Sequence, residues 1–166
     1  LPPAFEVRLT SQNKKEKILE MTPSFIQYMG VPGYLWVVRD ITERKLMEQL
    51  QSALYRISET ANLSKNLDTL YGSIHKIIGE LIDAKNLYIA LYHEPTNTVS
   101  FPYYVDQFSS NPGRRKGALG VTEYVIHTGQ TLLVNPEILA EMVRNGQVES
   151  FGALPVNWLG IPFALQ

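Results

Sequence analysis

Three consecutive basic residues form the densest cluster of charge in the sequence that could bind a ligand. Arg114, Arg115 and Lys116 stand between Gly113 and Gly117, in a stretch rich in Ser, Asn, Gly and Pro that is long enough for a functional loop. The planar guanidinium fork suits a carboxylate or a phosphate, so the cluster predicts an anion contact at the mouth of a pocket. The alternative is a solvated loop whose charges meet only water.

The histidines and carboxylates predict neither a metal site nor acid–base catalysis. None of the histidines has a partner at the i, i+4 or His-x-His spacing of metal ligands. They are His75, His93 and His127. The carboxylates of Asp83, Asp106 and Glu123 are scattered, so nothing pairs them for proton transfer. The phosphate-binding pattern Gly-x-x-x-x-Gly-Lys-Ser/Thr does not occur, so we expect no catalytic residue and no nucleotide hydrolysis.

Aromatic side chains fall on several expected strands, where alternation would turn about half of them into a core. They are Tyr88, Tyr92, Phe101, Tyr103, Tyr104 and Trp158. Some of them are suited to line a small-molecule pocket, which is mostly apolar with a few polar groups, and plain core packing is the alternative. The candidate ligand-pocket residues are Tyr88, Tyr103, Arg114, Arg115, Glu123 and Trp158.

The apolar pattern predicts an α+β fold, with strands where residues alternate or are β-branched and helices where they recur at helical spacing. The expected strands are 5–10, 18–28, 34–41, 86–92, 98–105, 131–134 and 158–165. The expected helices are 42–62, 67–81, 119–127 and 136–145. Turns are expected at 11–15, 30–33 and 93–97, and a loop at 106–117. Pro23 is expected at an edge or a bulge of its strand.

Asp40 stands where the third expected strand meets the first expected helix. Its carboxylate is placed to accept from the backbone N–H of Glu43, whose own side chain can reach back to Asp40, as in a capping box. Apolar residues then recur at alternating spacings of three and four, which makes one narrow stripe of the coiled-coil kind. The stripe consists of Met47, Leu50, Leu54, Ile57 and Ala61. It predicts a parallel homodimer through residues 42–62, and packing on the parent domain is the alternative.

Composition and charge exclude several classes of partner. A formal net charge of -1 gives no general attraction to nucleic acid or to an anionic membrane. No apolar run is long enough for a membrane span, and no signal peptide opens the chain, so we expect a cytoplasmic segment. The absence of cysteine excludes disulfides, thiolate metal sites and thioether-linked cofactors. The chain begins and ends inside expected strands, so we expect a piece of a longer protein.

Residues 1–41 resemble the C-terminal strands of a PAS domain. The resemblance is carried by residues 5–9, by residues 17–21 and by the run Leu35-Trp36-Val37-Val38-Arg39-Asp40-Ile41-Thr42-Glu43-Arg44. The closing Asp-Ile-Thr-Glu-Arg after a strand is its most specific part. The resemblance implies antiparallel PAS strands followed by a signalling helix over 42–62, with the N-terminal strands and the ligand-covering helices of the family missing.

Residues 63–166 resemble most of a GAF domain of the bacterial sensor type. The matching stretches are 81–92, 100–106, 120–129 and 158–162. The resemblance implies an antiparallel sheet flanked by helices that binds an unknown small molecule, with the last strand and helix of the family missing. A cysteine-linked bilin and methionine sulfoxide reduction, both known in the family, need cysteines that this chain lacks. The family's cyclic-nucleotide pattern Asn-Lys-x-Phe-Asp-Glu is not visible either.

Together the two resemblances imply a non-catalytic sensory module of the PAS–GAF type. The parent protein is then expected to be a sensor histidine kinase, with a diguanylate cyclase as the alternative, and its output domain is a further expected partner. An enzyme on the GAF scaffold is a different class of function, which the missing cysteines argue against. A ligand-free dimerisation spacer also stays open.

Overall fold

The computed structural model describes residues 4–10, 16–64, 66–149 and 157–163. It is an α+β structure whose contacts divide it into two compact units, Leu1–Ile82 and Asp83–Gln166. The sequence led us to expect domain boundaries at residues 41/42 and 62/63. The contacts between residues instead group both long helices with the N-terminal sheet. None of the helices in the described ranges combines the length and apolar composition needed to cross a membrane.

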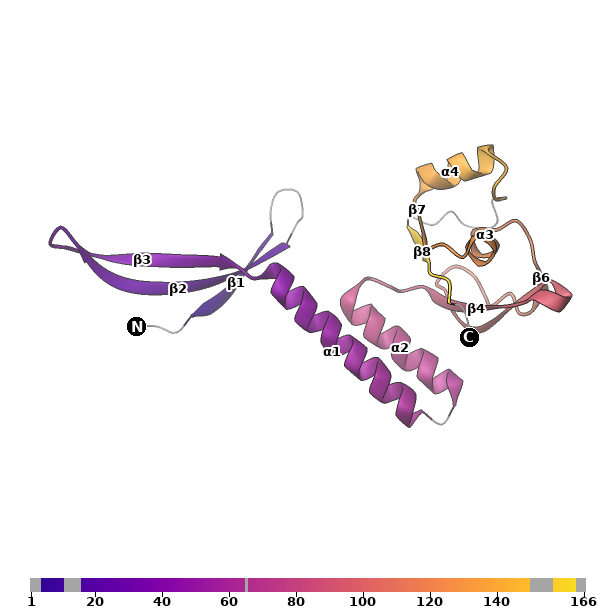
Figure 1. Cartoon of the computed structure of the whole chain (residues 1–166), viewed down its shortest axis with the longest axis horizontal. Coiled ribbons are helices and arrows are strands. Elements are labelled where there is room, and N and C mark those ends of the chain that lie inside the picture. The colour runs from indigo at the N-terminus through magenta and orange to yellow at the C-terminus, as the bar shows by residue number, and fades with distance from the viewer. Residues whose placement is uncertain (1–3, 11–15, 65, 150–156, 164–166) are drawn as a thin grey trace. The chain divides into compact units, whose positions relative to one another are not determined.

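An antiparallel meander opens the first unit, in the order β1-β2-β3 (Figure 1). Its strands are β1 (Phe5–Thr10), β2 (Glu16–Tyr28) and β3 (Val31–Asp40). Tyr28 pairs with Val31, so a two-residue turn of Met29 and Gly30 joins β2 to β3, with φ of 51° and 81°. Positive φ at both positions matches the right-handed twist of the strands. The expected turn at 30–33 was therefore wrong, because Val31, Pro32 and Gly33 are already part of β3.

Among the described residues, Pro23 of β2 has one neighbouring strand. It pairs with Trp36 of β3, and the described β1 pairing ends at Phe5 and Met21. In the described part of the sheet, Pro23 is therefore at an edge, which is the position that a residue without a backbone N–H favours. This agrees with the edge position expected for Pro23.

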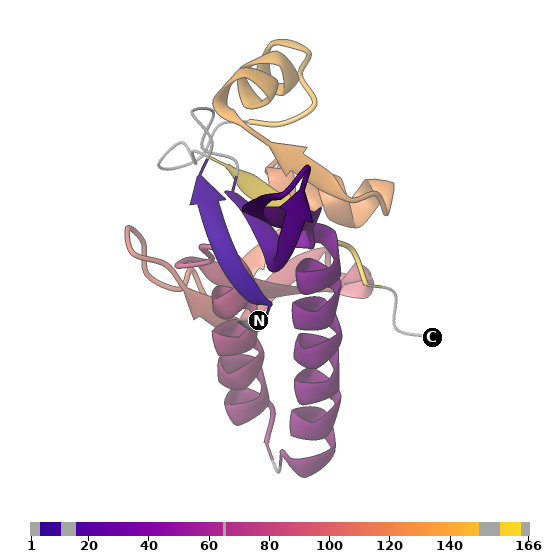
Figure 2. The ribbon, with the colours of Figure 1, turned by 90° about the vertical axis from the view of Figure 1, so that its left-hand side faces the viewer.

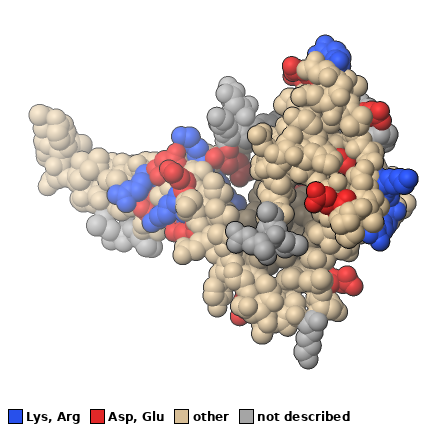
Figure 3. All heavy atoms as spheres, turned by 45° about the vertical axis from the view of Figure 1, so that its right-hand side comes forward, with Lys and Arg blue, Asp and Glu red and all other residues tan. Residues whose placement is uncertain are grey.

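The distal hairpin, residues 21–38, contains no charged residue. Figure 3 shows the end of this sheet free of Lys, Arg, Asp and Glu, with charged side chains gathered where the sheet meets the helix. Aromatic pairs lie across one face, with ring centroids 6.0 Å apart for Phe5 and Trp36 and 5.7 Å apart for Phe25 and Tyr34. Tyr34 is 65% exposed and Trp36 is 47% exposed, so the aromatic rings contact one another without being buried.

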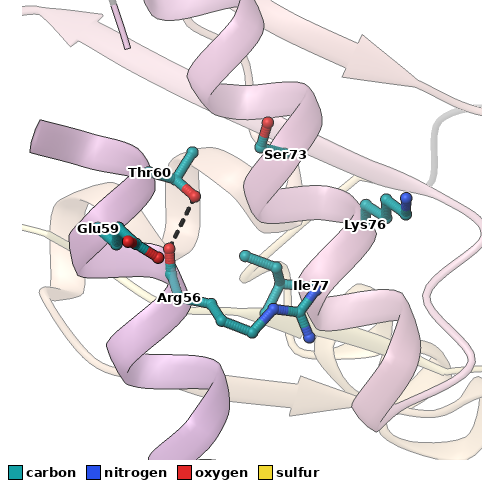
Figure 4. Close-up of a pocket in the computed structure, with 6 residues that line it drawn as sticks. All are labelled: Arg56, Glu59, Thr60, Ser73, Lys76 and Ile77. Atoms are coloured by element: carbon teal, nitrogen blue, oxygen red, sulfur yellow. Dashed lines mark hydrogen bonds between the residues drawn. The ribbon is translucent and has the colours of Figure 1, made fainter. Parts of the chain in front are cut away.

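Two antiparallel helices complete the first unit and lie side by side in both ribbon views (Figures 1 and 2). They are α1 (Thr42–Leu63) and α2 (Leu67–Leu81). Ala53 of α1 and Ile77 of α2 are buried. The Arg56 guanidinium donates to both carboxylate oxygens of Glu80. Beside this pair, six residues of the two helices line a hollow of about 260 Å³ (Figure 4): Arg56, Glu59, Thr60, Ser73, Lys76 and Ile77.

The second unit contains two small antiparallel sheets and two helices. One sheet has the order β4-β5-β6, from β4 (Leu87–His93), β5 (Thr98–Val105) and β6 (Arg115–Lys116), with the 3-10 helix η1 (Glu94–Thr96) between β4 and β5. The other pairs β7 (Leu132–Val134) with β8 (Trp158–Gly160). The helices are α3 (Val121–Thr128) and α4 (Pro136–Arg144). Val134, Leu139, Met142 and Val148 form one buried apolar cluster of this unit.

Two expectations for the second unit were wrong in extent. The loop expected at 106–117 contains β6, which pairs with Thr98 and Val99 of β5. The last strand ends at Gly160 instead of reaching residue 165, and residues 164–166 lie outside the described part.

Candidate functional site

A strand–helix junction of five residues, Lys17, Ile18, Asp40, Ile41 and Thr42, joins β2, β3 and α1. The Asp40 carboxylate accepts from the backbone N–H of Thr42 at 3.0 Å and from the Thr42 hydroxyl at 2.6 Å. The same hydroxyl accepts from the N–H of Ile18 at 2.9 Å, and the N–H of Ile41 donates to the carbonyl of Ile18 at 2.8 Å. The first residues of α1 are therefore hydrogen-bonded to the central strand.

The capping box expected at this junction was wrong. Asp40 Oδ1 accepts from Thr42, two residues on, instead of from Glu43, and Ile41 occupies the N-cap position without a side-chain cap. The physical reason is that the hydroxyl and the backbone N–H of Thr42 both donate to Asp40 Oδ1.

Ion pairs extend the junction to the outer strand β1. Lys45 of α1 lies 2.7 Å from Glu6 of β1, and Arg44 lies 3.4 Å from Glu20 of β2. Lys17 of β2 pairs with Asp40 at 3.0 Å. These pairs are partly exposed, so each contributes little stability by itself. Their placement still couples the first turn of α1 to both neighbouring strands.

Titration of Asp40 is expected to loosen the junction in acid. Hydrogen bonds from the Thr42 hydroxyl, then from Lys17 and the Thr42 backbone, lower the pKa of Asp40 from 3.8 to about 2. The stability that this carboxylate contributes is thus present above pH 3.8 and is lost as the pH falls through about 2. In a carboxyl NMR titration, Thr42→Val should raise the midpoint of Asp40 toward 3.8, and Lys17→Gln should raise it less. An unchanged midpoint in Thr42→Val would contradict this assignment.

The expected helix stripe lies only partly against α2. Met47, Leu50 and Leu54 are 59%, 42% and 57% exposed. Ile57 is half-buried, and Ala61 is exposed. The residue of α1 that is buried is Ala53, which the stripe does not include. Three large apolar side chains of the stripe therefore remain open along one side of α1.

Four of the candidate pocket residues come together in the second unit, in two pairs. The first pair joins β4 to β8, because the indole N–H of Trp158 donates to the Tyr88 hydroxyl at 2.9 Å. The same hydroxyl lies 2.8 Å from the hydroxyl of Thr122 on α3. Burial raises the pKa of the Tyr88 phenol, so it stays a neutral hydrogen-bonding group. Thr122 had no signal in the sequence beyond its position in an expected helix.

The second pair is a buried ion pair between β6 and α3. Arg115 donates to Oε1 of Glu123, which also accepts from the N–H of Ala118 at 3.4 Å. Glu123 is 1% exposed, and its Oε2 is buried with no hydrogen-bond partner among the described residues. The guanidinium carbon lies 5.6 Å from the centroid of the Phe101 ring. Arg115 is therefore paired with a carboxylate of the protein itself. The sequence had led us to expect either a cation that binds a ligand or one that meets only water.

Tyr103 and Arg114 do not join these residues. A β-bulge places one extra residue of β5 between the pairs Ile89–Tyr103 and Leu91–Ser100. The bulge reverses the alternation, so Tyr104 stacks on Tyr88 with ring centroids 5.7 Å apart. Arg114 instead donates from Nε to the Thr98 hydroxyl at 3.2 Å. The sequence gives no sign of the bulge, which explains the misplacement of Tyr103.

Gly160 lets the Trp158 ring lie against its own strand. A Cβ atom at Gly160 would stand 2.3 Å from the Trp158 ring and 3.0 Å from Val125. Any larger residue would therefore displace the indole that bonds to Tyr88.

Among the described residues, the candidate side chains that come together form hydrogen bonds and one ion pair. In the ranges that the structure describes, no three His, Asp or Glu side chains gather as metal ligands. The hydroxyls of Tyr88 and Thr122 hydrogen-bond to each other, and Glu123 Oε2 is a buried acceptor without a partner among the described residues. Compared with protein-family models, with curated proteins and with solved structures, the chain matches none of them.

Proposed function

We propose that this chain is a non-catalytic sensory module of the PAS–GAF type, which relays a change of state through α1 to an output domain of its parent protein. The observation that carries the proposal is the strand–helix junction. Hydrogen bonds and ion pairs tie the first turn of α1 to β1 and β2, while β3 continues directly into the helix. A rearrangement of these strands would therefore disturb the contacts that hold the first turn of α1.

Relay by this route requires two states that a ligand or partner stabilises differently. The residues proposed to contact such a ligand are Tyr88, Trp158 and Glu123, whose polar atoms lie inside the second unit. The output domain would be a histidine kinase or a diguanylate cyclase, and the module would work in the cytoplasm.

The exposed stripe of α1 favours a parallel homodimer as the working form. Leu50→Glu is expected to weaken the dimer by at least roughly 100-fold, because it places a carboxylate in an apolar seam. Leu50 is 42% exposed in the single chain, so its fold should survive the change. Sedimentation equilibrium measures the mass directly and should move from the dimer to the monomer.

Ser52→Glu is the matched control for Leu50→Glu. It adds the same charge two residues away, on the opposite side of α1 from the seam, and Ser52 is exposed. The dimer should persist in this variant. A wild-type chain that stays monomeric at high concentration, or equal loss in both variants, would refute a dimer through α1.

A ligand-free dimerisation spacer is the second candidate, and one observation favours it. Trp158 and Thr122 each hydrogen-bond to the Tyr88 hydroxyl, and Arg115 pairs with Glu123, so both groups are held together without a ligand. Native mass spectrometry of freshly purified chain separates the two candidates. A retained small molecule of constant mass supports the sensor, and its absence together with a dimer supports the spacer.

A further inference from the structure

A second region of the second unit has the chemistry of an anion site. Five residues line a groove of about 430 Å³: Leu91, Tyr92, His93, Ser100 and Arg114. This volume is within the range of small-molecule pockets. No carboxylate is among the lining residues. The groove shares no residue with the pairs formed by Tyr88, Trp158, Arg115 and Glu123.

A chain of hydrogen bonds connects the two nitrogen-bearing side chains of the groove. Arg114 Nε donates to the Thr98 hydroxyl at 3.2 Å, and the Thr98 and Thr96 hydroxyls lie 2.8 Å apart. Thr96 in turn lies 2.8 Å from Nδ1 of His93. The threonine hydroxyls thus hydrogen-bond to one nitrogen of the Arg114 guanidinium, Nε, and to one nitrogen of the His93 imidazole, Nδ1. The remaining nitrogens, Nη1 and Nη2 of Arg114 and Nε2 of His93, have no hydrogen-bond partner among the described residues.

Two cations lie at the groove, Arg114 and Lys116. Arg114 forms no ion pair with any carboxylate in the described ranges, in contrast to Arg115 next to it. The register places His93, Thr98 and Lys116 in one row across three strands, so Lys116 adds a second cation to the same face. Leu91 is 45% exposed and gives the groove an apolar wall.

We propose that this groove binds a small organic oxyanion, with the carboxylate or phosphate group on Arg114 and His93 and an apolar body against Leu91. The guanidinium fork matches the two oxygens of either group, and His93 Nε2 supplies a further donor when it carries a proton. This site does not rest on the relay proposal, since it needs only the second unit. It also separates Arg114 from Arg115: the first is the ligand-binding cation and the second is structural.

Phenyl phosphate, benzoate and inorganic phosphate are suitable probes, titrated into the full chain at constant ionic strength and followed by amide NMR shifts. Phenyl phosphate or benzoate should shift the amides of residues 91–93, 98–100 and 114, and should bind more tightly than inorganic phosphate because of the apolar wall. Preference between the two aromatic probes identifies the natural ligand as a phosphate ester or a carboxylic acid. Arg114→Gln should weaken the preferred probe by about tenfold or more.

Arg144→Gln is the matched control, because it removes the same charge from an exposed position on α4. Binding should be unchanged in this variant, and His93→Gln should show a smaller loss than Arg114→Gln. Three results would overturn the proposal: no saturable shifts with any probe, equal weakening in Arg114→Gln and Arg144→Gln, or equal affinity for inorganic and phenyl phosphate. Unchanged far-UV circular dichroism excludes unfolding as the cause of a loss.

Discussion

Replacing Arg115 with alanine is expected to lower the free energy of unfolding of the second unit by about 3 kcal/mol, because it strands the buried carboxylate of Glu123. Glu123 is 1% exposed, whereas the Arg115 side chain is 35% exposed and can be lost without opening a deep cavity. The cost therefore comes mainly from an unpaired charge. Urea unfolding followed by Trp158 fluorescence measures it, in a Trp36→Phe background in which Trp158 is the remaining tryptophan.

Two further variants isolate the charge effect in Arg115→Ala. Lys116→Ala removes the neighbouring exposed cation and should change the free energy of unfolding little. The double change Arg115→Met with Glu123→Leu should recover most of the loss, because apolar residues of similar size often replace a buried ion pair without cost. A double variant no more stable than Arg115→Ala would show that the side-chain packing, and not the stranded charge, is responsible.

Gly160→Ala is expected to destabilise the second unit by roughly 1–3 kcal/mol, because the added methyl group overlaps the Trp158 ring. The added carbon would stand 2.3 Å from that ring, so the indole must move and its hydrogen bond to Tyr88 must break or lengthen. Trp158 fluorescence should shift toward that of an exposed indole, and the unfolding midpoint in urea should fall.

Gly79→Ala is the matched glycine substitution for this test. A Cβ atom at Gly79, in the last turn of α2, meets nothing within 4 Å. That change should be neutral or should stabilise the first unit by up to about 1 kcal/mol. If Gly160→Ala left the stability and the fluorescence unchanged, the close approach of Trp158 to Gly160 would be disproved.

The elements that could be predicted from sequence are those that a pattern within a single segment determines. Residues 42–62 read as a helix because apolar side chains recur at helical spacing, and α1 spans Thr42–Leu63. The hairpin turn was misplaced because Gly30 to Gly33 contains the strongest turn formers, whereas the register of Tyr28 with Val31 selects Met29 and Gly30. Register depends on the whole strand pair, which no local pattern encodes.

In the candidate site, too, features that depend on residue type could be predicted, whereas those that depend on strand pairing could not. Residue type alone singled out Tyr88, Arg115, Glu123 and Trp158, which the fold brings together in two pairs. It did not place Tyr103, whose side of the sheet is set by a bulge, nor separate Arg114 from Arg115, which depends on the β6 pairing. The Thr42 hydroxyl was missed because its partners, Ile18 and Asp40, meet only after β2 and β3 have paired.

The uncharged hairpin of residues 21–38 favours self-association of the protein at high concentration. In the described sheet β3 pairs with β2 alone, so its outer edge keeps free backbone donors and acceptors beside exposed aromatic rings. Proteins usually protect such an edge with lysine or another charge, and none occurs in these residues. The same residues that favour strand formation therefore also make this hairpin prone to self-association into aggregates.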